Sequence, residues 1–488
     1  MAEQKSPRVS KAETKAKGRP DWPWYTYPLW YLSYLALWIW AKVCFRFSYA
    51  YGPGVEAALE SEEPVLLLAN HQSFTDPIFV MLALKARPIR FVVGYFLAHV
   101  SKFKGMMRAL RAIPIQQFVA DPAALRQILR ALKNQERVLI FPEGQRSIDG
   151  RPSPFDYGTL RLAAKAQACV ITVRLSGAYL AWPRWNQGRF RCGKVEARLD
   201  VLARAGEWAK LDQVGWQQKL QAQLSYDDPA WAHRHSLKYS RGRKLAGLSL
   251  ILHACPACGR AEVMQADGWL LSCQACGASF RFNANYQVVT GEKGPPEAES
   301  PLPLLAGGLE GPSANQLNRG FMPKDIGAWH HWQIQEEGSA WQRLIERSEA
   351  ESEASRPVDQ DPVLASWLTW QDLGKLGLGE RDQAAPHFLV TLPINYEDVG
   401  PLASEHKAGK RPGLLRLNAR GCYLEGPEGR VRLPLRPGSL LMFSQGDYVQ
   451  VKNGEALLRL YPHNPLAVIR LVDLSLYLHA KLYKSKKP

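Results

Sequence analysis

Two stretches decide the fold: residues 64–77, PVLLLANHQSFTDP, and residues 138–147, VLIFPEGQRS. In each, a short apolar run precedes a polar turn, Val65–Ala69 in the first stretch and Val138–Phe141 in the second. Short continuous apolar runs are typical of buried strands, and α/β proteins bind their ligands where such strands end. The sequence therefore predicts an α/β domain whose site lies beyond the ends of these two strands.

The first turn carries a histidine and an aspartate. His71 ends the strand, and we expect a helix through 78–84 that is capped by Ser73. Asp76 then follows His71 within about a helical turn, so its carboxylate can hold one imidazole nitrogen and leave the other as a general base. With no cysteine nearby, and no G-x-S-x-G motif to indicate a serine hydrolase, the pair indicates deprotonation of a substrate hydroxyl. The same spacing also occurs by chance.

The second turn gathers Glu143, Gly144, Arg146 and Ser147. Glycine lets a backbone approach a ligand closely, and the guanidinium fork of Arg146 suits a phosphate. A surface turn with a solvated Arg–Glu pair would also account for this stretch taken alone.

Together the two stretches resemble the glycerolipid acyltransferase family, which includes the 1-acylglycerol-3-phosphate acyltransferases, over roughly residues 45–200. The NHxSxxDP motif of the family is matched at Asn70, His71, Ser73, Asp76 and Pro77. The FPEGxRS motif is matched at Phe141–Gly144, Arg146 and Ser147.

The resemblance implies an α/β domain with a mixed sheet flanked by helices, and an O-acyltransferase activity. His71 would be the general base, oriented by Asp76. A lipid hydroxyl would attack an acyl thioester carried by CoA or acyl carrier protein, with no covalent enzyme intermediate. The resemblance further implies that a lysophospholipid or glycerol phosphate acceptor is bound by Asn70, Ser73, Glu143, Gly144, Arg146 and Ser147.

The chain departs from the family pattern at three places. Gln117 stands about where the family often has an arginine for the acceptor phosphate, with Arg108 or Arg111 as candidate substitutes. Gln145 replaces the usual threonine of the second motif. The stretch 170–179 resembles a further family block but lacks its proline. These departures weaken the identification of lysophosphatidate as the acceptor and leave acyl transfer intact.

The amino-terminal region points to a membrane. The chain carries 62 Lys and Arg against 45 Asp and Glu over 488 residues, a net charge of +17. Residues 1–21 read as a disordered basic tail, and residues 22–50 as a membrane-associated helix; nine of the 20 uncharged residues 22–41 are Trp or Tyr. With Pro23 and Pro28 disrupting its first turns, the helical core should run from about Leu29 to Phe47. An interfacial helix fits best; a spanning helix and a buried soluble helix are the alternatives. Anionic lipids at a cytoplasmic face are the expected partners.

A second site follows the acyltransferase-like part, which we expect over residues 51–245. Cys255, Cys258, Cys273 and Cys276 have the C-x₂-C-x₁₄-C-x₂-C spacing of a zinc ribbon, expected over residues 250–285. A disulfide pair or a redox C-x-x-C is the alternative. The ribbon is close to charge-neutral, so no nucleic-acid partner is expected.

The remaining chain reads as a linker with short helices over residues 286–385 and an antiparallel β domain over residues 386–488. Six short strands, a hairpin turn at Asn453-Gly454 and a final helix over 466–483 resemble a pleckstrin-homology or GRAM-type barrel. A plain β-sandwich would also fit. The alternative function for the whole chain is a non-catalytic lipid-binding scaffold that recruits partners through the ribbon and the β domain.

Overall fold

The computed structural model describes residues 26–99, 103–115, 121–153, 155–186, 190–239, 244–289 and 321–336, together with seven strands between residues 390 and 462. The chain divides into two compact units. One comprises Met1–Gly144, Pro152–Ala178 and Lys194–Tyr226, and the other comprises Gln145–Arg151, Tyr179–Gly193 and Asp227–Pro488. The expected basic tail, Gln117 and the expected final helix lie outside the described residues.

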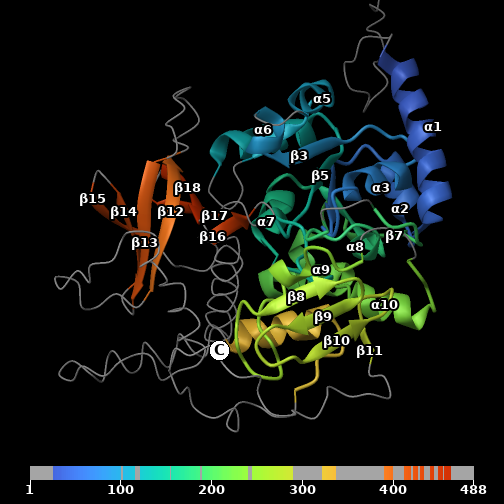
Figure 1. Cartoon of the computed structure of the whole chain (residues 1–488). Coiled ribbons are helices and arrows are strands. Elements are labelled where there is room, and N and C mark those ends of the chain that lie inside the picture. The colour runs from blue at the N-terminus through green and yellow to red at the C-terminus, as the bar shows by residue number, and fades with distance from the viewer. Residues whose placement is uncertain are drawn as a thin grey trace, which may run out of the picture. The chain divides into compact units, whose positions relative to one another are not determined.

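A seven-stranded mixed sheet forms the centre of the first unit, in the order β1-β7-β6-β2-β5-β3-β4. Figure 1 labels β3, β5 and β7 of this sheet. Its strands are β1 (Ser48–Tyr51), β2 (Val65–Ala69), β3 (Arg90–Gly94), β4 (Ile113–Ile115), β5 (Val138–Ile140), β6 (Cys169–Ser176) and β7 (Glu196–Ala203). Neighbours run parallel except β6 and β7. The predicted α/β class and both predicted strands are confirmed. Because β2 and β5 are parallel neighbours, with Leu66 opposite Val138, their carboxyl ends meet at one edge of the sheet.

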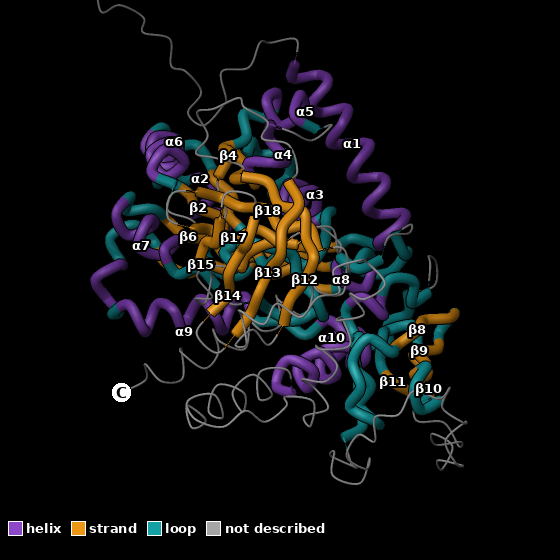
Figure 2. Tube along the Cα trace, turned by 60° about the vertical axis from the view of Figure 1, so that its left-hand side comes forward, coloured by secondary structure: helices purple, strands orange, loops and turns teal. Residues whose placement is uncertain are grey.

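Helices cover the two faces of this sheet (Figure 2). The helices of the first unit are α1 (Thr26–Phe45), α2 (Val55–Glu60), α3 (Asp76–Ala83), α4 (Tyr95–His99), α5 (Lys104–Ala109), α6 (Pro122–Lys133), α7 (Gly158–Lys165) and α9 (Gln213–Leu224). Leu66 and Leu68 of β2 join one buried cluster with side chains of α6, α7 and α9. Since strand residues alternate between faces, Leu67 points to the face opposite Leu66 and Leu68. Helix α3 packs on β1, β6 and β7, and α1 packs against α3.

Helix α1 begins earlier than the sequence indicated. It starts at Thr26 and includes Pro28, because a proline in the first turn removes an N–H that has no helical partner anyway. Its last turns are anchored through Phe45, which is fully buried and packs against Phe79 of α3 at 5.3 Å between ring centroids. Several large apolar side chains of α1 remain exposed, namely Tyr31, Leu32, Leu35, Trp38, Ile39 and Val43. Within the described part of the chain, no helix has the length and apolarity needed to cross a membrane.

In the second unit, a four-stranded antiparallel sheet carries the cysteine motif. Its order is β11-β10-β9-β8, with β8 (Met264–Asp267), β9 (Leu270–Cys273), β10 (Ser279–Phe282) and β11 (Val288–Val289). The short α8 (Ala178–Ala181), α10 (Asp228–Arg234) and a helix over residues 326–336 complete the description of this region. Trp329 of the last helix is fully buried beside Phe280 and Phe282 of β10.

A separate antiparallel sheet follows, in the order β15-β14-β13-β12-β18-β17-β16. Its strands are β12 (Val390–Asp398), β13 (Arg411–Asn418), β14 (Gly421–Gly426), β15 (Gly429–Leu433), β16 (Leu440–Phe443), β17 (Val449–Asn453) and β18 (Ala456–Pro462). A hairpin joins β17 to β18 as predicted, but Asn453 belongs to the ladder and pairs with Ala456, so the turn lies one residue later than the expected Asn453-Gly454. Strand β12 was not expected, and the resemblance to a pleckstrin-homology or GRAM-type barrel stays a prediction.

Candidate active site and metal centre

The turn after β2 is folded around the carboxylate of Asp76. The Oδ2 atom of Asp76 lies 2.9 Å from Nδ1 of His71 and accepts the backbone N–H groups of Gln72 and Ser73, at 2.5 and 2.7 Å. The Asp76 side chain is fully buried, whereas 20% of the His71 side chain is exposed. Asp76 therefore fixes which imidazole nitrogen faces the protein. The other nitrogen, Nε2, is the one that can serve as a general base.

Ser73 does not cap α3, contrary to the sequence-based expectation. The N-cap is Thr75, whose side chain makes no capping hydrogen bond; Pro77 at the second helical position has no N–H to donate, and the N–H of Ile78 donates to the backbone carbonyl of Thr75 at 3.0 Å. The Ser73 hydroxyl is buried and lies 3.1 Å from that of Thr75.

Glu143 joins the turn after β5 to the turn after β2. Its Oε1 accepts the backbone N–H of His71 at 2.8 Å, and its Oε2 accepts that of Ser153 at 2.8 Å. The hydroxyl of Tyr226 donates to the same carboxyl group, at 3.1 Å from Oε2. Burial, the largest influence, raises the pKa of Glu143 to about 8. At neutral pH this group is then mostly protonated, which avoids a second negative charge beside Asp76.

Two further side chains hold His71 in place. The ring of Phe141 stacks on the imidazole at 4.2 Å between centroids. The fully buried side-chain amide of Asn70 donates to the carbonyl of Leu175 at 2.9 Å and accepts its N–H at 2.7 Å. Asn70 thus binds the end of β2 to β6 through the backbone, and this contact uses both polar groups of its side chain.

The second motif continues into the second unit as the Gln145–Arg151 loop. Ser147 is buried, and its hydroxyl donates to the carbonyl of Arg151 at 2.7 Å and accepts the N–H of Gly150 at 2.9 Å. Gly144, just before the loop, has a φ of 67°, a backbone conformation that favours glycine. The carbonyl of Arg146 accepts a hydrogen bond from Arg184 at 3.3 Å. Ser147 therefore shapes its own loop, and Arg146 is the motif residue of this loop with a cationic side chain.

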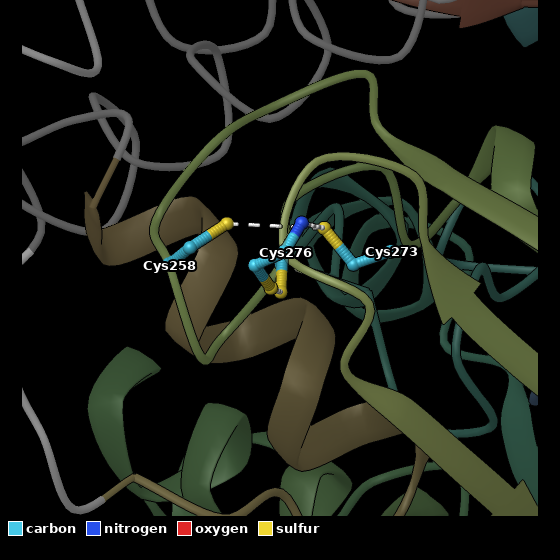
Figure 3. Close-up of side chains that lie close together, drawn as sticks. Cys258, Cys273 and Cys276 are labelled. Carbon is cyan, nitrogen blue, oxygen red and sulfur yellow. Dashed lines mark hydrogen bonds between the residues drawn. The ribbon is translucent and has the colours of Figure 1, made fainter. Parts of the chain in front are cut away.

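The four cysteines of the ribbon form one cluster, with all sulfur atoms within 4.8 Å of one another. Figure 3 shows the side chains of Cys258, Cys273 and Cys276 converging. Sulfur–sulfur distances of 3.8 Å join Cys255 to Cys276 and Cys258 to Cys273, too long for a disulfide. A tetrahedral thiolate shell with metal–sulfur bonds of about 2.3 Å places its sulfurs about 3.8 Å apart. The cluster therefore fits a four-coordinate metal ion.

The thiols are positioned by two similar turns, one in each C-x₂-C pair. Gly259 and Gly277 have φ values of 72° and 74°, and their N–H groups donate to the carbonyls of Cys255 and Cys273 at 2.8 and 3.0 Å. The Sγ of Cys273 also accepts backbone N–H groups at 3.4 Å. Each C-x₂-C pair is thus shaped by hydrogen bonds within its own few residues, which is why the spacing was readable from the sequence.

Of the residues singled out in the sequence, the structure brings His71, Asp76 and Glu143 together and gathers the four cysteines in one cluster. The contacts of Tyr226 and Ser153 with Glu143 were not expected. Tyr226 lies 83 residues from Glu143 along the chain, and nothing around it in the sequence marks it as a partner. Of the proposed substitutes for the missing family arginine, Arg111 lies 3.8 Å from Glu136, and Arg108 is exposed.

Comparison with known proteins bears on the segment that holds the first-unit site. The acyltransferase family model matches residues 55–176. The chloroplastic 1-acyl-sn-glycerol-3-phosphate acyltransferase BAT2 of Brassica napus is 31% identical over 148 residues, which are 29% of this chain and 41% of that protein. Its Arabidopsis thaliana counterpart LPAT1 is 30% identical, over 29% of this chain and 40% of that protein.

A mammalian relative and a solved structure also match. The 1-acyl-sn-glycerol-3-phosphate acyltransferase alpha of Bos taurus is 26% identical over 31% of this chain and 54% of that protein. The crystal structure of the 1-acyl-sn-glycerophosphate (LPA) acyltransferase PlsC from Thermotoga maritima is 20% identical, covering 43% of this chain and 81% of that chain, with a TM-score of 0.33. That score is too low to establish a common fold.

The match spans less than half the length of the Brassica napus and Arabidopsis thaliana relatives. The matched stretch nevertheless contains both motifs, including His71, Asp76 and Glu143. Residues 55–176 therefore match the acyltransferase family, and this segment is similar to the 1-acyl-sn-glycerol-3-phosphate acyltransferases.

Proposed function

We propose that the chain is an O-acyltransferase that moves a fatty acyl group from a thioester to a hydroxyl of a lysophosphatidate-type glycerolipid. The observation that carries this proposal is the buried Asp76 carboxylate, 2.9 Å from Nδ1 of the partly exposed His71, within the family-matched segment. The acyl donor is a thioester of CoA or of acyl carrier protein.

The chemistry needs one base and no nucleophile from the protein. Nε2 of His71 accepts the proton of the acceptor hydroxyl as the hydroxyl oxygen attacks the thioester carbonyl carbon. The tetrahedral intermediate then collapses, the carbon–sulfur bond breaks, and the proton on His71 passes to the leaving thiolate. Asp76 stabilises the imidazolium that exists between these steps, as an adjacent carboxylate does for a catalytic histidine.

The remaining motif residues divide into two roles under this proposal. Arg146 binds the phosphate of the acceptor, because its guanidinium offers paired donors to the phosphate oxygens. Glu143, Asn70, Ser73 and Ser147 hold the two turns in shape, because their polar groups contact backbone or neighbouring side chains of those turns.

Three accessory roles belong to the same proposal. The exposed apolar side chains of α1 lie on a membrane surface, where an apolar helix face next to a basic segment gains both burial and attraction to anionic lipid. The four-cysteine cluster holds a structural Zn²⁺, which is suited to four thiolates in tetrahedral geometry. The antiparallel sheet β12–β18 acts as a lipid- or protein-binding module.

The decisive experiment compares His71→Ala with His99→Ala, using acyl-CoA or acyl carrier protein thioesters and a panel of lysophospholipids. His99 is an exposed histidine at the end of α4, so its variant controls for loss of an imidazole. Loss of a general base lowers kcat by about 10²- to 10⁴-fold. We expect that loss for His71→Ala alone, with an unchanged circular dichroism spectrum. Full turnover by His71→Ala would refute the mechanism. Loss of vesicle binding as its only effect would favour a lipid-binding scaffold.

A further inference from the structure

The Gln145–Arg151 loop is held on several sides by residues of its own unit. The hydroxyl of Tyr179 donates to the carbonyl of Ile148 at 3.0 Å. The backbone N–H of Asp228 donates to the carbonyl of Gly150 at 3.2 Å. Gly150 has a φ of 87°, and a Cβ built there would lie 2.9 Å from the Tyr179 ring. The loop therefore has little room to adopt another conformation while these neighbours stay in place.

Two charged contacts join this loop to the region 325–336. Nη2 of Arg151 donates to both carboxylate oxygens of Asp325, at 3.0 and 3.2 Å. Nδ1 of His330, which is buried, lies 3.1 Å from Oδ2 of Asp149. Gly327 leaves space for this arrangement, since a Cβ there would lie 2.0 Å from Nη1 of Arg151. Both contacts are partly shielded from water, where ionic hydrogen bonds are worth more than at the surface.

The helix over residues 326–336 is also hydrogen-bonded to the backbone just before the first cysteine turn of the ribbon. The indole N–H of Trp329 donates to the carbonyl of Ala254 at 2.8 Å, next to Cys255. Oε1 of Gln333 accepts the N–H groups of His253 and Ala254, at 3.0 and 3.1 Å. Trp329 and His330 are adjacent in sequence, so one turn of this helix contacts both the ribbon and the loop.

A second route joins the ribbon to the loop through Arg191. This buried guanidinium donates to the carbonyl of Ala284 and lies 4.6 Å from the centroid of the Tyr286 ring. Tyr286 packs on Trp185 at 5.0 Å, and the indole N–H of Trp185 donates to the hydroxyl of Tyr179 at 2.8 Å. That same hydroxyl donates to the loop at Ile148, so both routes end on the loop.

We propose that the ribbon and the helix over residues 326–336 act as a clamp that sets the position of the Gln145–Arg151 loop. His330 and Asp325 are positioning residues for this loop. Metal binding by the four cysteines fixes the turn that Trp329 and Gln333 contact, and so further restricts the motion of the loop. The consequence for turnover rests on the proposed function, because the loop carries Arg146, which we propose binds the acceptor phosphate. A loose loop would then weaken acceptor binding more than it slows the chemical step.

The test substitutes His330 in three ways. His330→Leu keeps the volume but loses the hydrogen bond to Asp149, His330→Asn restores a donor near the place of Nδ1, and His331→Asn alters the exposed neighbour as a control. We measure hydrogen exchange of the peptide over residues 145–151 by mass spectrometry, together with KM for the acceptor and kcat.

We expect the loop of His330→Leu to exchange about 10-fold faster, as the loss of one partly buried hydrogen bond allows. KM for the acceptor should rise by a similar factor while kcat stays within about twofold. His330→Asn should recover most of both effects, and His331→Asn should match the wild type. Unchanged loop exchange in His330→Leu would overturn the proposal, as would a fall in kcat with no change in KM.

The metal arm uses the purified zinc-loaded protein before and after chelation. Chelation should speed exchange in the loop as well as in the ribbon, and should add little further in His330→Leu, because both changes act on one connection. Faster exchange confined to the ribbon would refute the clamp. Absence of turnover with every lysophospholipid, alongside the expected loop exchange, would instead refute the proposed acyl transfer and support the clamp.

Discussion

The substitution Glu143→Gln tests the central link between the two motif turns. Glutamine has the size of the native side chain and retains an Oε1 acceptor for the N–H of His71, but it cannot ionise. In the native protein, burial raises the pKa of Glu143 to about 8 from an ordinary value of 4.5. The variant should therefore remove one source of pH dependence from the stability of the first unit.

The sign and size follow from proton linkage. A carboxyl group whose pKa is raised in the folded state binds its proton more tightly there, so its contribution to stability is complete below pH 4.5 and is lost as the pH rises through about 8. At about 1.4 kcal/mol per pKa unit, the full loss is roughly 5 kcal/mol, of which about 4 kcal/mol falls between pH 5 and pH 9. Across that range, the free energy of unfolding of Glu143→Gln should rise by about 4 kcal/mol relative to the wild type.

The assay must report on the first unit alone. Met81 of α3 is 7% exposed, so its oxidation by peroxide in increasing urea, read by mass spectrometry, follows the opening of this unit. Glu207→Gln is the matched control. The pKa of Glu207 is lowered, chiefly by its hydrogen bond to Lys210, so its contribution is lost only at pH values below the ordinary 4.5 and should leave the range from pH 5 to pH 9 unchanged.

A change of less than about 1 kcal/mol in the relative stability of Glu143→Gln over this range would refute the reasoning. It would mean that the N–H groups of His71 and Ser153 and the Tyr226 hydroxyl stabilise the charged carboxylate enough to offset its burial. A change of the opposite sign would place the carboxylate in a net cationic environment and would contradict the site geometry.

Further substitutions test other parts of the structure. Asn70→Ala should lower the free energy of unfolding by about 1–3 kcal/mol for each backbone group it leaves unpaired, measured by the same oxidation assay. Gly150→Ala should destabilise the second unit by more than about 1 kcal/mol, because Gly150 has a positive φ. Gly105→Ala should be slightly stabilising, because a Cβ at Gly105 would meet open space. Thermal denaturation measures both changes. Replacing exposed Leu32 and Val43 of α1 by serine should weaken sedimentation with anionic vesicles by at least about tenfold, and equal binding would contradict the proposed membrane surface.

Several features were readable because they are local. The β2 and β5 strands follow from short apolar runs, and His71 and Asp76 meet because five residues of turn and helix start bring them to one place. The two cysteine turns depend on hydrogen bonds that span four residues each. The hairpin between β17 and β18 is likewise local, although its turn begins after Asn453, one residue later than the sequence indicated. Backbone geometry over a few residues is enough to encode each of these.

The boundaries of helices were less readable than their existence. Helix α1 begins at Thr26 rather than near Leu29, because a proline in the first turn interrupts no hydrogen bond. Helix α3 likewise begins after Thr75 rather than after Ser73, with Pro77 in its first turn. The helix over 326–336 was expected only as a short segment within a linker, since the pattern around Trp329 and His330 did not show that their partners are a cysteine turn and a motif loop.

The sequence by itself determined the α/β class of the first unit, the two motif turns and the four-cysteine cluster, because each is fixed by residues a few positions apart. Only the tertiary structure decided that Glu143 accepts a hydrogen bond from the N–H of His71, 72 residues away along the chain. It likewise decided that His330 contacts Asp149, 181 residues away along the chain. Such partners share no periodicity or spacing. They are selected by packing, which buries a polar group only where another polar group can meet it.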